Sequence, residues 1–396
     1  MTTDSKILAY FKSLRIVHLI LAVSFVTAGL CVNFVQSVLF VTLKPINARL
    51  YRKINYYVTY FLNCFIVYMV EWWSGSEAII YGDPVMVKKC MGKEHALLLI
   101  NHNLEIDWLF GWTIFERLGG LGNIRSYCKK VLQYVPIFGW SWKCQEFVFL
   151  DRNWEKDRKN LGRQLRALTQ YPDPVWLSLF PEGTRFTSDK HAASMKIAAE
   201  KGLPLLKHHL LPRTKGFTAS IPHLRGKFDA IYDVVMAVEK TCNNPASVVS
   251  MMEGKPLKII SLYRRIPMSQ VPDDETEAAA WLQKLYQEKD KVLDNYEKYG
   301  KFVPEEDRDK EEYKTYQSFE TFQLPRRYYT LCIATIWGCI VMMGLSRYFW
   351  HVLMSGSVAQ ILLLVSVCGG AYAGLNYVIN LTKISTSSSY GTSKAS

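Results

Sequence analysis

The chain has 396 residues, of which 49% are apolar, and its 48 Lys and Arg against 35 Asp and Glu give a formal net charge of +13. This composition is too apolar for an ordinary soluble protein and too polar for a chain buried wholly in lipid, so it indicates a globular domain joined to a few membrane segments. The positive charge suits an anionic membrane surface, a polyanionic substrate or nucleic acid. Nucleic acid is the weakest of these, because zinc-finger spacings and RNP-type motifs are absent, whereas four apolar segments favour lipid.

Nine dispersed cysteines form no CxxC pair, which predicts free thiols on the reducing side of a membrane and neither a disulfide frame nor a zinc site.

Apolar runs at both ends of the chain predict membrane segments. Ile16 to Leu43 is long enough, at about 1.5 Å per residue, to cross a hydrocarbon core of roughly 30 Å, and it is too long for a cleaved signal peptide. The aromatic run Tyr56 to Trp73 predicts an interfacial helix, a hairpin partner for the first segment or a second span. Two further runs within residues 326–381 predict a C-terminal membrane hairpin, and the basic residues beside it favour a cytosolic domain.

Between these segments, from about residue 78 to 300, strand-length apolar runs alternate with helical patterns, which predicts an α/β domain. We expect strands near 96–100, 146–150, 175–180, 230–238 and 257–263, and helices near 106–118, 154–169 and 189–201. An amphipathic helix follows a capping box formed by Asp274 and Glu277. Residues 301–325 are densely charged, which predicts a solvated linker, and the chain ends are a short N-terminal segment, 1–15, and a serine-rich disordered tail, 382–396.

The stretch NHNLEID, residues 101–107, places a histidine and a carboxylate five residues apart, directly after the predicted strand at 96–100. An imidazole accepts a proton from an alcohol near neutral pH, and a carboxylate on its other nitrogen fixes the tautomer and stabilises the imidazolium. On a regular helix the two side chains would point about 140° apart. His102 and Asp107 can therefore meet only across a strand-to-helix turn; the alternative is a structural pair without chemistry.

A second predicted strand leads into FPEGTRF, residues 180–186, which brings Glu182, Gly183, Thr184 and Arg185 into one turn. This composition is typical of an anion-binding loop, because a guanidinium holds a phosphate through two parallel hydrogen bonds and glycine lets the backbone approach closely. A local ion pair between Glu182 and Arg185 is the alternative. Sites in α/β sheets collect beyond the carboxyl ends of strands, so we expect both turns at one site.

Four sequence blocks, in order, resemble those of the glycerolipid acyltransferases, which include the 1-acylglycerol-3-phosphate acyltransferases. NHNLEID matches the family's NHxxxxD box and FPEGTR matches its FPEGTR box, while FLDRNW at 149–154 and LLPRTKGF at 210–217 correspond to two further blocks. The resemblance runs from about residue 16 through the C-terminal apolar segments and is closest to the eukaryotic gamma and delta types. It implies a mixed sheet with surrounding helices, flanked by N-terminal and C-terminal membrane helices.

The resemblance also implies a chemistry. His102 would deprotonate the 2-hydroxyl of 1-acyl-sn-glycerol-3-phosphate, which attacks acyl-CoA and gives phosphatidic acid, while Asp107 stabilises the imidazolium. Substrate binding would fall to residues of the other blocks: Arg152, Glu182, Gly183, Thr184, Arg185, Arg213 and Lys215. The implied partners are acyl-CoA, a lysophospholipid and the bilayer; acyl-CoA is a substrate, and neither a metal nor another cofactor is implied. Family members typically reside in the endoplasmic reticulum, so we expect a multi-pass protein of that membrane with a cytosolic catalytic domain.

Three alternatives stay open. The acceptor could be another lysophospholipid such as lysophosphatidylinositol, or the chain could be a non-catalytic lipid-binding membrane protein, which a missing His102 or Asp107 would favour; both are present. A serine hydrolase is the third, but the nearest GxSxG-like stretch, residues 139–143, lacks the second glycine. Arg152 could also form an ion pair with Asp151 in place of binding phosphate. The motifs determine neither the oligomeric state nor the acyl-chain preference.

Overall fold

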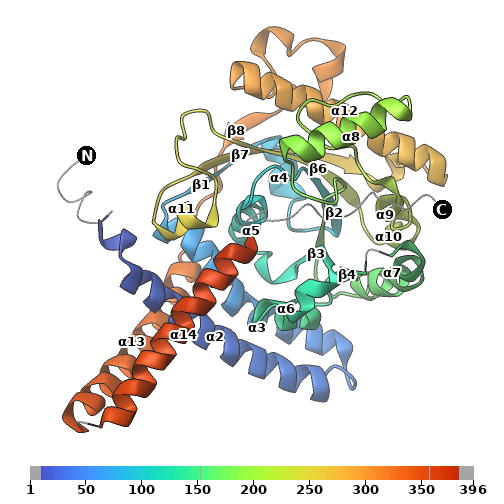
Figure 1. Ribbon diagram of the computed structural model, residues 1–396. Helices are drawn as coiled ribbons and strands as arrows, with labels where there is room; N and C mark the ends of the chain where they lie inside the picture. The colour runs from blue at the N-terminus through green and yellow to red at the C-terminus, as the bar shows by residue number, and fades with distance from the viewer. Residues whose placement is uncertain (1–9, 152, 356, 383–396) are drawn as a thin grey trace, which may run out of the picture.

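The central strand of the fold is β2 (Ala96–Ile100), which is buried at all five of its residues. In the computed structural model, which describes residues 10–151, 153–355 and 357–382, it lies within an eight-stranded mixed sheet (Figure 1). The other strands are β1 (Glu77–Gly82), β3 (Ile124–Lys129), β4 (Val148–Leu150), β5 (Trp176–Leu179), β6 (Ala230–Val238), β7 (Lys258–Pro267) and β8 (Glu320–Phe322). This architecture confirms the predicted mixed α/β class. The predicted tail at 382–396 lies, apart from its first residue, outside the described residues.

The strand order is β4-β3-β5-β2-β6-β7-β1-β8. From β4 to β6 each strand runs parallel to its neighbour, β7 pairs antiparallel with β6, β1 runs parallel to β7, and β8 closes the edge antiparallel to β1. A continuous apolar sequence such as ALLLI suits a parallel strand covered on both faces. The carboxyl ends of β2 and β5 point to the same edge of the sheet, and both motifs follow these ends.

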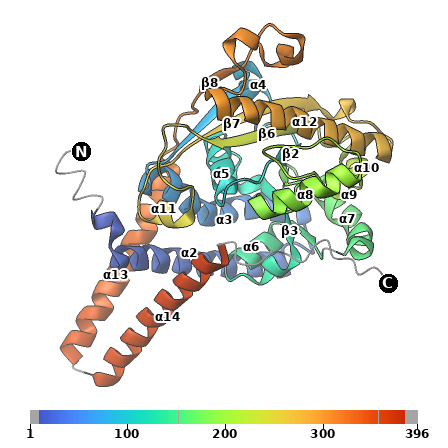
Figure 2. The same ribbon diagram turned by 45° about the horizontal axis from the view of Figure 1, so that its top comes forward.

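Helices cover both faces of the sheet (Figures 1 and 2). On one face, α5 (Asp107–Arg117) packs Phe110 and Ile114 into an apolar cluster with Leu98 of β2. On the other face, Leu97 and Leu99 lie in a cluster with side chains of α7 (Trp154–Leu168), α10 (Ile221–Leu224) and the long α12 (Glu275–Tyr299). The other helices of the domain are α4 (Pro84–Lys89), α6 (Phe138–Cys144), α8 (Ser188–Glu200), α9 (Thr214–Thr218) and α11 (Val248–Met252).

The predicted strands and helices between 96 and 263 are all present, with shifted ends in several cases. The sequence analysis missed β1, β3 and β8. In β3, the sequence IRSYCK carries polar residues at half of its positions, so its apolar pattern is weak. The strand β7 extends to Pro267, beyond the expected end at 263, because Arg264 and Arg265 remain in the strand and pair with the carboxylates of Asp233 and Glu94.

Residues 301–325 are not a solvated linker, so this prediction was wrong. Five of their side chains are buried in an apolar cluster with α12, β6 and β7: Phe302, Val303, Tyr313, Tyr316 and Phe319. The same stretch supplies β8, which pairs with β1. The charged residues between these side chains dominate the composition and hide the aromatic pattern that attaches the segment to the sheet.

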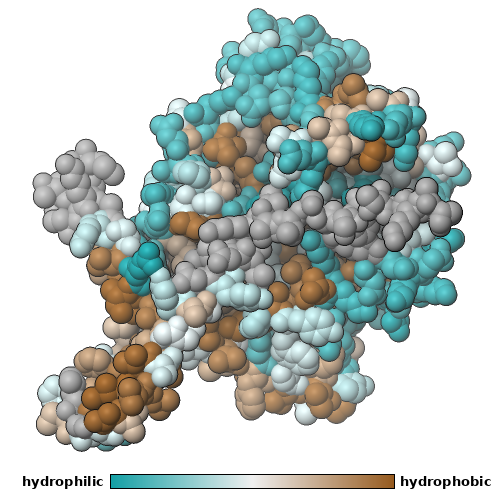
Figure 3. All heavy atoms as spheres, viewed as in Figure 1, coloured by the Kyte–Doolittle hydropathy of each residue, from teal (hydrophilic) through white to brown (hydrophobic). Residues whose placement is uncertain are grey.

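Within the described residues, two helices are long and apolar enough to cross a membrane: α2 (Arg15–Thr42), and Tyr329–Val352 within α13 (Tyr329–Ser355). A further helix, α14 (Val358–Thr382), is apolar from 358 to 374. The α13 and α14 helices extend away from the domain and meet at their far end (Figure 2), where apolar residues gather on the surface (Figure 3). Exposed apolar side chains such as Ile340, Met343 and Leu362 indicate membrane association.

The aromatic run at 56–73 belongs to α3 (Ala48–Tyr68) and a π-helical turn, Met69–Trp73, and α3 packs along α2 as its hairpin partner. Polar side chains of α3 bind to neighbouring helices. Asn55 Oδ1 accepts a hydrogen bond from Gln36 Nε2 of α2 at 3.2 Å. The Tyr51 hydroxyl donates to the Cys144 carbonyl at 2.7 Å, which attaches α3 to the domain. The second apolar segment thus connects the apolar helix α2 with the α/β domain.

Candidate active site

His102 lies on the irregular segment that joins β2 to α5, with its side chain 26% exposed, and Asp107 is the buried first residue of α5. Nδ1 of His102 lies 2.7 Å from Oδ2 of Asp107. The second carboxylate oxygen accepts the backbone N–H of Trp108 at 2.8 Å, and the helix N-terminus favours negative charge there. Because an ionised carboxylate only accepts hydrogen bonds, Nδ1–H donates to Asp107, and Nε2 is the ring atom left to accept a proton.

The backbone around His102 is held on several sides. The side chain of Asn101 donates to the Met236 carbonyl at 3.1 Å and accepts from the Met236 N–H at 2.8 Å, which fixes the start of the turn to β6. The His102 carbonyl accepts the N–H of Phe186 at 2.8 Å. The ring of Phe180 lies 4.8 Å from the His102 ring, measured between centroids. The two motifs are therefore packed directly against each other, as their positions after β2 and β5 predict.

Glu182 is buried, with 1% of its surface exposed, and joins two loops. Its Oε1 accepts the backbone N–H of His102 at 3.1 Å, and its Oε2 accepts that of Leu210 at 3.2 Å. Burial raises the pKa of this carboxyl, while His209 and the two backbone N–H groups act against the rise. This geometry makes Glu182 a positioning residue for the His102 turn, a role that the sequence analysis did not assign to it.

The FPEGTR turn gathers cationic groups. Gly183 has a φ of +69°, and a Cβ at this position would lie 3.0 Å from Cδ of Arg213, so glycine allows both the turn and the close approach of that arginine. The N–H of Arg213 donates to the Pro181 carbonyl at 2.8 Å. Arg185, 16% exposed, has its Nη1 3.9 Å from Oε2 of Glu105. The turn and the loop that follows α8 thus place two guanidinium groups in one region.

Lys190, in the first turn of α8, extends this region and was missed in the sequence analysis. Its Nζ donates to the hydroxyl of Thr184 at 2.8 Å and to the Arg185 carbonyl at 3.3 Å. Its place three residues after the N-cap Thr187 was the available signal, because side chains of a helix tilt toward its N-terminus, and α8 begins just after the FPEGTR turn.

The remaining candidates are placed differently. Lys215, on α9, lies with its Nζ 5.7 Å from the centroid of the Trp154 ring, at the start of α7. Arg152 lies outside the described residues, and its neighbour Asp151 binds Nζ of Lys130 at 2.8 Å. Within the described part of the chain, no group of three or more His, Cys, Asp or Glu side chains could hold a metal ion.

Comparison with known proteins matches both halves of the domain to acyltransferases. Residues 80–234 match the family model described as Acyltransferase, and residues 250–337 match the one described as Acyltransferase C-terminus. The chain is 41% identical over 385 residues to 1-acyl-sn-glycerol-3-phosphate acyltransferase gamma of Homo sapiens, with 97% of each chain covered. It is 39% identical over 385 residues to the delta protein of Bos taurus, again with 97% of each chain covered.

The chain belongs to the 1-acyl-sn-glycerol-3-phosphate acyltransferase family. This confirms the resemblance drawn from the four sequence blocks. No solved structure matches the chain. The Acyltransferase segment carries the His102 and Glu182 turns, and the Acyltransferase C-terminus segment carries α12.

Proposed function

We propose that this acyltransferase moves an acyl chain from acyl-CoA to the 2-hydroxyl of 1-acyl-sn-glycerol-3-phosphate, which gives phosphatidic acid. The observation that carries this proposal is the 2.7 Å pair of His102 Nδ1 and Asp107 Oδ2 beside the cationic FPEGTR turn. A base next to a phosphate-binding region suits an acceptor that carries both a hydroxyl and a phosphate. The names of the gamma and delta relatives support the same acceptor.

The reaction follows from the geometry of the pair. Nε2 of His102 removes the proton of the acceptor hydroxyl as its oxygen attacks the thioester carbonyl carbon of acyl-CoA. Asp107 accepts the Nδ1–H bond throughout and stabilises the imidazolium. The new ester forms as the carbon–sulfur bond breaks, and the leaving thiolate of CoA takes the proton back from Nε2. His102 returns to its starting state, and no group of the protein is consumed.

Acceptor binding is assigned to the cationic turn. Arg185 and Arg213 present planar guanidinium groups that suit two-point binding of a phosphate, and Thr184 with Gly183 allows the phosphate to approach the backbone. Lys190 adds a third positive charge at the same turn. Glu182 orders this region through backbone contacts, and Arg152 and Lys215 stay candidates for contacts to either substrate.

The acceptor comes from the membrane, and this source determines where we propose that the active site lies. A lysophospholipid is held in the bilayer by its acyl chain, whereas acyl-CoA arrives from water, so the site must lie at the membrane surface. We propose a multi-pass protein of the endoplasmic reticulum whose catalytic domain is cytosolic. The basic residues Arg326 and Arg327 at the domain end of α13 support this orientation, since positive residues flank cytosolic ends of spans.

A headgroup experiment tests the function. Purified protein is supplied with labelled acyl-CoA and either 1-acyl-sn-glycerol-3-phosphate or lysophosphatidylinositol, and kcat and KM are measured for each acceptor. We expect 1-acyl-sn-glycerol-3-phosphate to be preferred and Arg185→Ala to raise its KM about 10- to 100-fold, because hydrogen bonds between charged groups contribute about 1.5–3 kcal/mol. Arg185→Lys should rescue poorly, since an ammonium cannot form two parallel bonds.

Arg163→Ala, which changes an exposed arginine of α7, is the matched control and should leave both constants unchanged. A preference for lysophosphatidylinositol would show that this lipid, and not 1-acyl-sn-glycerol-3-phosphate, is the acceptor. No transfer to any lysophospholipid would favour the non-catalytic alternative. A change confined to the KM of acyl-CoA in Arg185→Ala would move this arginine to the donor site.

A further inference from the structure

The helix α12 contacts the catalytic region through two consecutive residues. The first is Lys289, which is fully buried. Its Nζ donates to the Leu99 carbonyl at 2.9 Å and to the Val234 carbonyl at 2.7 Å, and it lies 2.5 Å from Oδ1 of Asp233. A buried ammonium requires such partners. Because Leu99 lies three residues before His102, Lys289 fixes the end of β2 just ahead of the catalytic turn.

The second residue, Asp290, binds the loop 206–211. Its two oxygens accept the backbone N–H groups of Lys207 at 2.7 Å and His208 at 2.8 Å. Its Oδ1 also lies 3.0 Å from Nδ1 of His209, whose side chain is fully buried. Burial acts to raise the pKa of Asp290, but the hydrogen bonds from His209 and the loop backbone outweigh it and lower the pKa below its usual value. The carboxylate therefore stays ionised, and Nδ1–H of His209 donates to it.

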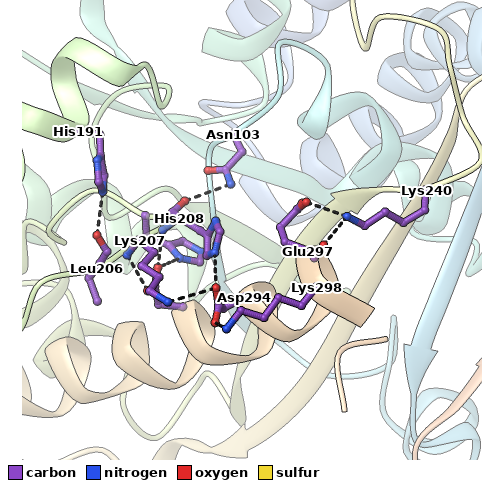
Figure 4. A network of polar contacts seen from close by, with 11 residues as sticks. Asn103, His191, Leu206, Lys207, His208, Lys240, Asp294, Glu297 and Lys298 are labelled. Carbon is purple, nitrogen blue, oxygen red and sulfur yellow. Dashed lines mark hydrogen bonds and ion pairs between the residues drawn. The ribbon is translucent and has the colours of Figure 1, made fainter. Parts of the chain in front are cut away.

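The same loop reaches the catalytic turn at two points. The Leu210 N–H donates to Glu182 Oε2 at 3.2 Å, and the other oxygen of Glu182 holds the N–H of His102. The side chain of Asn103, next to His102, donates to the His208 carbonyl at 3.3 Å (Figure 4). The loop thus links α12 by hydrogen bonds to the backbone N–H of His102, through Glu182, and to the side chain of Asn103.

We propose that Asp290 and His209 are positioning residues for the catalytic base: they fix the loop 206–211, which in turn holds the His102 turn through Glu182 and Asn103. This inference rests on the proposed function and assigns to the Acyltransferase C-terminus segment a part in the reaction, since α12 lies within it. His209 Nε2 has no hydrogen-bond partner in the described part of the chain, so Asp290 alone orients this ring by hydrogen bonding.

A neighbouring pair on the same helix provides an internal control. Asp294, one turn after Asp290, has its Oδ1 3.0 Å from Nε2 of His208 (Figure 4). It also lies 3.5 Å from Nζ of Lys207 and 2.6 Å from Nζ of Lys298. Lys207 and Lys298 are exposed, and His208 and Asp294 are partly exposed, so water screens these pairs and they contribute little. The two histidine–aspartate pairs share their chemistry, but only the Asp290 pair binds the loop backbone.

The experiment compares Asp290→Asn with Asp294→Asn in the full-length protein in membranes. We expect Asp290→Asn to lower kcat about 10- to 100-fold with little change in the KM of either substrate, because a displaced base loses alignment while the binding groups remain. Asp294→Asn should keep the wild-type kcat. Wild-type kcat in Asp290→Asn would overturn the inference alone, whereas a wild-type protein that transfers no acyl chain would overturn the proposed function and this inference with it.

A second variant tests the same series of hydrogen bonds at its other end, beside His102. It also tests the proposal if Asp290→Asn does not fold. Asn103→Ala removes a partly exposed contact between the turn and the loop and leaves the core intact. We expect Asn103→Ala to lower kcat. In the double variant Asn103→Ala/Asp290→Asn, the fold-loss in kcat should be smaller than the product of the two single fold-losses, since both changes act on one loop. An unchanged kcat in Asn103→Ala, or losses that multiply fully, would contradict the proposal.

Discussion

Replacing His102 with alanine should lower kcat for acyl transfer about 10²- to 10⁴-fold, the usual contribution of a positioned general base. The imidazole is a quarter exposed and its Nδ1 is held by Asp107, so the ring supplies the only proton acceptor assigned to the hydroxyl in this site. The measurement is steady-state transfer of labelled acyl groups from acyl-CoA to 1-acyl-sn-glycerol-3-phosphate.

The fold should tolerate this change. His102 is only partly buried, so its removal empties no apolar core, and the melting temperature and membrane insertion should stay near those of the wild type. His351→Ala, which changes an exposed histidine of α13, is the control and should keep full activity. Turnover near the wild-type value in His102→Ala would rule out this residue as the base.

Replacing Asp107 with asparagine should impair the reaction almost as severely, by about 10²- to 10⁴-fold in kcat. The amide is nearly the same size, and with its oxygen toward His102 it can still accept from Nδ1–H and orient the ring, although its NH2 group then faces the Trp108 N–H in place of the second carboxylate oxygen. What is lost is the negative charge that stabilises the imidazolium formed during transfer. Asp107 is buried beside that ring, where little water can replace the charge.

The matched control is Asp273→Asn, which removes an exposed carboxylate that pairs with Arg225. It should leave kcat unchanged. If Asp107→Asn retained full kcat, the carboxylate would serve only to orient the ring, and the charge-stabilising part of the mechanism would be incorrect.

The sequence predicted the part of the site that depends on local structure. His102 meets Asp107 because a strand is followed by a turn and then by a helix. The strand, the turn and the first residue of the helix all fall within residues 96–107. The second turn could be added because parallel strands end at the same edge of a sheet. Both predictions needed only periodicity and the spacing of a few residue types.

The role of Glu182 could not be predicted, because it depends on contacts between distant parts of the chain. Its carboxylate reaches the His102 backbone across 80 residues, and Asp290 reaches the loop at His208 across 82. The sequence analysis assigned no role to Lys289 and Asp290 on the amphipathic helix. They are buried polar residues whose partners include backbone carbonyl and N–H groups from distant segments, and backbone partners leave no residue pattern in the sequence.

Measuring the position of the new ester in the product tests the central claim most directly. Purified protein is incubated with labelled acyl-CoA and 1-acyl-sn-glycerol-3-phosphate, and the position of the label in the product is determined by enzymatic cleavage of each ester. We predict phosphatidic acid with the label at the 2-position, formed by the wild type and lost in His102→Ala. Release of the label as free fatty acid without labelled phosphatidic acid, or equal labelling by both proteins, would contradict the account.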